Sequence, residues 1–130
     1  MHYAYTIVYV REPEDSLAFY ERAFGLSRRF ISPDGDYGEL QTGATTISFA
    51  RHALARESLG HDYAAVDASA RPPGIEIGFA VADVPAAYAR AVEAGATALK
   101  APTVKPWGQT VAYVRCPDGS LVELCTPMAG

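Results

Sequence analysis

Cysteine, histidine and tryptophan are scarce in this sequence, and their scarcity narrows what the protein can be. The 130 residues contain two cysteines, three histidines and one tryptophan. Cys116 and Cys125 flank a predicted hairpin whose register brings Cys125 closer to Ala112 than to Cys116, so we expect two free thiols, as in a reducing compartment. Neither cysteine has the paired spacing of a zinc site.

Long apolar runs and basic clusters are also lacking. No stretch approaches the roughly 20 apolar residues of a membrane span, and the first twelve residues lack a signal-peptide pattern. Eleven Lys and Arg residues are dispersed against fifteen Asp and Glu residues, giving a net charge of −4. This distribution argues against a nucleic-acid surface. We expect a cytoplasmic protein without a membrane or nucleic-acid partner.

The sequence instead contains an internal repeat. Strand-like runs at 3–10 and 74–81 each lead into an amphipathic helix, and these helices stop at Gly25 and Gly95. The offset between the copies holds at 70 to 71 residues, and both copies continue with further strand signals separated by turns. The pattern predicts an α+β fold in which two βαβββ modules form curved mixed sheets around a concave cavity.

The repeat also predicts the domain organisation. We expect one domain over residues 1–130, with module one at 3–51, a linker at 52–73 and module two at 74–127. The linker has no strand pattern and is predicted to carry a short helix. It is either a solvated connection or a lid over a ligand.

Strand alternation in module two predicts a pair of carboxylates. In the run 75–81 the large apolar residues share one face, which leaves Glu76 on the opposite, concave face. Glu123 lies on the last strand of the same module, next to the first strand. Two close carboxylates cannot both ionise cheaply, so one is expected to have a raised pKa and to serve as an acid or base. Alternatively, each accepts hydrogen bonds from Tyr5, Tyr113 or an arginine.

The only tryptophan, Trp107, lies between Pro106 and Gly108 at a predicted turn. Its ring either stacks on a flat or cationic ligand at the mouth of the cavity or closes one end of the sheet. Both interpretations stay open at this point.

Three motifs resemble the vicinal oxygen chelate superfamily. They are V-x-E-P-x-D-S-x-x-F-Y-x-x-x-F-G-L from Val10, F-x-V-x-D-V from Phe79 and R-C-P-D-G-S-L-V-E-L from Arg115. The superfamily includes glyoxalase I, bleomycin-resistance proteins, fosfomycin-resistance enzymes and extradiol dioxygenases. The resemblance covers nearly the whole chain and implies the paired-module fold. It also implies a homodimer, with the segment from Tyr3 to Tyr9 near the interface.

The resemblance further implies where a metal would bind. Enzymes of this superfamily use a His on the first strand of each copy and a Glu on the last strand of the second. Here the two His positions hold Tyr5 and Glu76, the optional ligand position falls near Ser48, and the terminal Glu is Glu123. Without imidazole we expect no cofactor, although the two carboxylates could hold a hard divalent ion weakly.

Two functions follow from these expectations. The first is a metal-independent protein that binds a small hydrophobic or aromatic molecule, as bleomycin-resistance-like proteins do. The alternative is a divergent glyoxalase-like lyase or isomerase that uses Glu76 and Glu123, either as an acid/base pair or around an unusual metal. The predicted site comprises Tyr5, Ser48, Glu76, Trp107, Tyr113 and Glu123.

Overall fold

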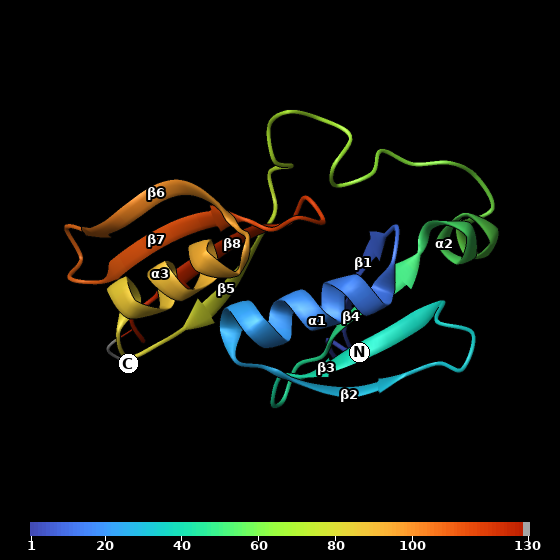
Figure 1. Cartoon of the computed structure of the whole chain (residues 1–130), viewed down its shortest axis with the longest axis horizontal. Helices are drawn as coiled ribbons and strands as arrows, with labels where there is room; N and C mark the ends of the chain where they lie inside the picture. The colour runs from blue at the N-terminus through green and yellow to red at the C-terminus, as the bar shows by residue number, and fades with distance from the viewer. Residues whose placement is uncertain (129–130) are drawn as a thin grey trace.

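A computed structural model describes residues 1–128 and consists of two βαβββ modules joined by a helical connection (Figure 1). Module one contains β1 (Thr6–Val10), α1 (Pro13–Phe24), β2 (Ser27–Ile31), β3 (Tyr37–Gln41) and β4 (Ile47–Arg51). The connection begins with α2 (His52–Leu59). Module two contains β5 (Glu76–Ala80), α3 (Val84–Ala94), β6 (Thr97–Val104), β7 (Thr110–Arg115) and β8 (Leu121–Cys125). The predicted α+β fold class is confirmed.

The two sheets have the same topology. Their strand orders are β1-β4-β3-β2 and β5-β8-β7-β6, and the first strand of each module pairs in parallel with its last strand. Strands β1 and β5 therefore each lie at a sheet edge, and the two four-stranded sheets stay separate. β1 starts at Thr6 rather than Tyr3, because pairing with β4 begins at the Thr6–Ile47 pair.

Both main helices start and end where the sequence signals predict. Pro13 occupies the first turn of α1, and Gly25 ends it in the left-handed conformation with a φ of 67°. At the start of α3 the Asp83 side chain accepts a hydrogen bond from the Ala86 N–H. Glu12 precedes α1 in the same position but makes no capping bond, because its carboxylate pairs with Arg51 at 3.0 Å.

Helix-to-helix packing joins the modules. Each helix covers one face of its own sheet, and α1 packs against α3 at the centre of the molecule (Figure 1). The Phe24 and Phe79 rings meet across this junction with centroids 5.1 Å apart. Two arginines add reciprocal bonds to carbonyls: Arg90 Nε donates to Arg22 O at 2.8 Å, and Arg22 Nη2 donates to Ala94 O at 3.4 Å.

The connection between the modules is anchored to both of them. On the module-one side, Tyr63 packs on Tyr9 with ring centroids 4.8 Å apart. On the module-two side, Arg115 donates hydrogen bonds to Val66 O at 2.9 Å and to Ala70 O at 3.0 Å. The predicted short helix in this segment is α2, and the rest follows the surface from one module to the other (Figure 1).

The expectation of two free cysteines is confirmed. Cys116 and Cys125 are both free, and Cys125 lies opposite Val111 in the β7–β8 pair. Within residues 1–128, no helix has both the length and the apolar character needed to cross a bilayer.

Candidate functional site

Module two carries a polar cluster on the sheet face that α3 leaves uncovered. Along β8, Val122 and Leu124 are buried in the core beneath the helix, so the intervening Glu123 projects from the other face. Tyr113 lies directly opposite Glu123 on β7, and its Oη donates a hydrogen bond to Glu123 Oε2 at 2.8 Å. Glu123 Oε1 lies next to Gly78, which pairs with Glu123 on β5, and a Cβ on Gly78 would lie 3.8 Å from this oxygen.

The electrostatics of this cluster favour proton retention. The hydrogen bond to the Glu123 carboxylate raises the pKa of Tyr113 to about 12, with burial adding to the effect. Desolvation, and then the charge on Glu123, raise the pKa of Glu76. Glu76 is exposed, so water screens much of this interaction. Burial also raises the pKa of the Cys125 thiol on the same face, and Glu123 contributes to that shift.

Module one carries a second polar cluster in the corresponding place. Ser48 pairs with Ile7 on β1 as Glu123 pairs with Gly78 on β5, and its side chain is fully buried. Tyr37 Oη lies 2.9 Å from Ser48 Oγ and 2.7 Å from Glu39 Oε2. Burial and the Glu39 carboxylate raise the pKa of Tyr37.

Tyr37 and Glu39 are site residues that the sequence analysis missed. The signal was present, because alternation along β3 places both on the face opposite the buried Leu40. Arg29 on β2 brings its Nε to 4.0 Å from Glu39 Oε1, so this cluster has a cation beside its carboxylate.

The structure brings together three of the six predicted site residues, namely Glu76, Tyr113 and Glu123. Tyr5 and Ser48 belong to the other module, where Tyr5 precedes β1 and is 56% exposed. Trp107 lies in the β6–β7 turn, where its Nε1 donates to Gln109 Oε1 at 2.9 Å. Because Trp107 is 65% exposed, its ring is not packed as a plug at the end of the sheet.

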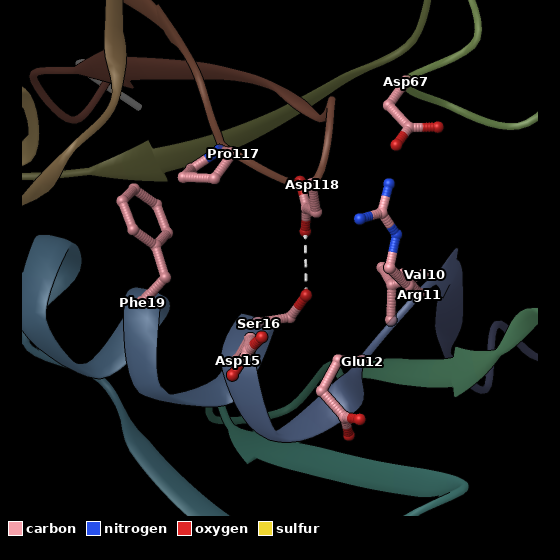
Figure 2. A pocket seen from close by; sticks show the side chains of 9 residues that line it. All are labelled: Val10, Arg11, Glu12, Asp15, Ser16, Phe19, Asp67, Pro117 and Asp118. Atoms are coloured by element: carbon pink, nitrogen blue, oxygen red, sulfur yellow. Dashed lines mark hydrogen bonds between the residues drawn. The ribbon is translucent and has the colours of Figure 1, made fainter.

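Three cavities lie along the boundary between the modules, and none of the three is lined by Glu123. The first has a volume of about 210 Å³ and lies where the β7–β8 turn approaches the start of α1 (Figure 2). Ser16 Oγ on α1 donates to Asp118 Oδ2 in that turn at 3.4 Å. Burial raises the pKa of Asp118 despite this bond and a bond from the Ser120 N–H. The bond ties module two to module one.

The residues present do not fit the superfamily's usual metal site. Tyr5 and Glu76 stand where the resemblance expects imidazole, and Tyr113 already occupies one oxygen of Glu123. In the part of the chain that the structure describes, no three His, Cys, Asp or Glu side chains are grouped so as to hold a metal ion.

The fold and the sequence together place the chain in a family. The profile of the Glyoxalase/Bleomycin resistance protein/Dioxygenase superfamily matches residues 2–124. The chain belongs to this superfamily. No protein with a curated description matches its sequence significantly.

Solved structures share the fold of this superfamily member at low sequence identity. A glyoxalase-related enzyme from Fulvimarina pelagi is 22% identical with a TM-score of 0.82, over 98% of this chain and 88% of its own. TioX from Micromonospora sp. ML1 is 21% identical with a TM-score of 0.72, and the match covers 98% of this chain and 100% of TioX. A glyoxalase/bleomycin resistance protein/dioxygenase family enzyme from Burkholderia phytofirmans PsJN is 23% identical with a TM-score of 0.74, over 96% and 98%. At these identities the likeness concerns the fold.

Proposed function

We propose that this superfamily member binds a small hydrophobic or aromatic molecule without the metal site usual in the superfamily. The observation that carries the proposal is the hydrogen bonding of Glu123, whose Oε2 accepts a hydrogen bond from Tyr113 Oη while Oε1 lies next to Gly78, its pairing partner on β5. A carboxylate held in this way is an oriented hydrogen-bond acceptor for a ligand. No imidazole stands at Tyr5 or Glu76 to make it a metal ligand instead.

The chemistry of the sheet faces suggests a planar, partly cationic ligand. Glu76 and Glu123 supply negative charge on one sheet, and Glu39 supplies it on the other. Tyr113 lies beside the carboxylates of module two and Tyr37 beside Glu39 of module one. The exposed Trp107 ring offers a further flat surface at the end of the module-two sheet. Aromatic faces and carboxylates both attract organic cations.

We further propose that the binding unit is a homodimer. The edge strands β1 and β5 and the apolar side chains near them are open in the single chain, with Tyr3 at 64% and Ile75 at 77% exposure. A second copy that covered these edges would bury this surface and bring another wall to the site. Light scattering at micromolar concentration should then give twice the 13.9 kDa chain mass, whereas a monomer mass contradicts the proposal.

The binding proposal is tested with a panel of planar aromatic amines and their neutral isosteres, followed by the fluorescence of Trp107, the only tryptophan. Glu123→Gln should weaken amine binding by about 1–3 kcal/mol, since it removes the charge from the accepting group. Trp107→Leu keeps an apolar side chain and removes the aromatic face, so we expect a loss of about 1–2 kcal/mol, measured by calorimetry. Full affinity in Glu123→Gln for every panel member that binds would refute the proposed site.

The raised pKa of Glu76 favours one alternative, a lyase or isomerase in which Glu76 transfers a proton. The discriminating measurement is deuterium exchange at carbon in a bound panel member, followed by NMR in D₂O. Exchange that requires Glu76, with affinity unchanged in Glu76→Gln, would establish the enzyme. Binding without exchange supports the binding protein.

A further inference from the structure

The largest of the three cavities at the module boundary lies between the end of α1, the β3–β4 turn, β5 and α3. Its volume is about 660 Å³, within the range of ligand pockets, which runs from about 300 to 1,000 Å³. Phe24, Leu26 and Phe79 give it apolar walls, and Thr42 and Thr45 from the turn add hydroxyl groups.

The internal repeat shows why this cavity is open. Three positions that line both cavities are equivalent in the repeat at an offset of 71 residues. They hold Asp15, Ser16 and Phe19 in the smaller cavity and Ala86, Ala87 and Arg90 in the larger one. The smaller cavity is bridged by the bond between Ser16 and Asp118 (Figure 2). In the second copy the corresponding positions hold two alanines and one arginine. The alanine side chains cannot make such a bond, so this cavity has no equivalent bridge.

Among residues 1–128, Arg90 is the only charged residue that lines the larger cavity. Its Nε is fixed by the bond to Arg22 O at 2.8 Å, and no ion pair between Arg90 and a carboxylate forms within residues 1–128. A Cβ on Gly25 would lie 3.0 Å from Arg90 Nη1, so the glycine leaves room for the guanidinium. The terminal amino groups of Arg90 are therefore available to an anion, and a planar carboxylate matches them with two hydrogen bonds.

We propose that this cleft is a second ligand site, for an apolar monocarboxylate whose head group binds Arg90 and whose hydrocarbon part lies against Phe24, Leu26 and Phe79. The apolar walls exclude a highly charged ligand, and the single arginine selects an anion over a neutral or cationic one. The site lies apart from Glu123 and Tyr113, so it goes beyond the binding function proposed above and does not depend on it.

The test uses decanoate as the probe, with 1-decanol as the uncharged control, measured by calorimetry and by amide NMR shifts of the full chain. We expect decanoate to bind with shifts concentrated at residues 24–26 and 86–90, and to bind about tenfold more tightly than decanol, because the charged hydrogen bonds to Arg90 are lost with the alcohol.

Two matched substitutions on α3 locate the site. Ala86 and Ala89 are both exposed, but only Ala86 lines the cavity. Ala86→Phe should fill the cleft and reduce decanoate affinity at least about tenfold, whereas Ala89→Phe should leave it within about twofold. Arg90→Gln should abolish the preference for decanoate over decanol, and Arg90→Lys should retain most of it. The thermal midpoint of each variant reports whether loss of the bond to Arg22 O has unfolded the junction.

Several outcomes would overturn the proposal. The first two are decanoate binding that is undetectable in the parent protein, or decanol binding as tight as decanoate binding. The other two are unchanged decanoate affinity in Ala86→Phe, or amide shifts on adding decanoate that are confined to β7 and β8. If Arg90→Gln does not fold, Ala86→Phe against Ala89→Phe still decides the question. Because Glu123→Gln should not alter decanoate binding, failure at this cleft is distinguishable from failure at the proposed site around Glu123.

Discussion

Replacing Glu123 by Gln should lower the pKa of Tyr113 and so test the geometry of the candidate site directly. In the parent protein the hydrogen bond to the Glu123 carboxylate, together with burial, holds the pKa of Tyr113 at about 12. An unperturbed tyrosine titrates near 10, so about two units of pKa are at stake. The amide of Gln still accepts a hydrogen bond but has no charge. We therefore expect Glu123→Gln to lower the pKa of Tyr113 by at least about one unit.

The assay is NMR titration of protein labelled with ¹³C at tyrosine Cζ, in which the Tyr113→Phe variant assigns the Tyr113 resonance among the eight tyrosines. Glu39→Gln is the matched control, because Glu39 lies within hydrogen-bond distance of Tyr37 in the other module. That change should lower the pKa of Tyr37 and leave Tyr113 unaffected. If Tyr113 titrates near 10 in the parent protein, or does not respond to Glu123→Gln, the pair is not formed and the reasoning fails.

Three further predictions concern metal, pH and the linker. Untagged protein purified without chelator should contain well under one equivalent of Ni, Zn, Mn or Fe by elemental analysis, and a stoichiometric metal would contradict this. Asp118 has a raised pKa in the folded state, so its ionisation destabilises the fold as the pH rises through that range. Asp118→Asn should therefore raise the free energy of unfolding at pH 7.5, measured by urea titration. This gain should disappear as the pH is lowered toward the ordinary Asp pKa of about 3.9. A lower free energy of unfolding in the variant at pH 7.5 would show that the hydrogen bonds of the carboxylate outweigh the cost of its ionisation. Gly119 has a φ of 100° and a Cβ there would lie 2.6 Å from Val66 O, so Gly119→Ala should cost at least about 2 kcal/mol of stability. Gly60→Ala, at a φ of 88° with nothing within 4 Å, is the control and should cost about 1 kcal/mol; equal losses would mean that the linker is not packed on this turn.

Much of the candidate site follows from local patterns in the sequence. Alternation along a strand is fixed by backbone geometry, so the apolar residues of the run 75–81 were sufficient to place Glu76 on the opposite face. Parallel pairing of β5 with β8 then brought Glu123 to the same face, as predicted. Alternation along β3 also places Tyr37 and Glu39 on one face, but their proximity to Ser48 depends on the register of β3 against β4, which no single strand encodes.

The sequence by itself determined the two modules, their helix ends and their strand faces, because turn residues and hydrophobic periodicity act over a few neighbours along the chain. Only the tertiary structure decided that the modules meet through α1 and α3 while their sheets stay separate. It also decided that equivalent positions in the repeat line a smaller cavity, bridged by Ser16 and Asp118, and a larger one beside Arg90. These outcomes depend on contacts between residues as far apart as Ser16 and Asp118, and such contacts form only when the whole chain has packed.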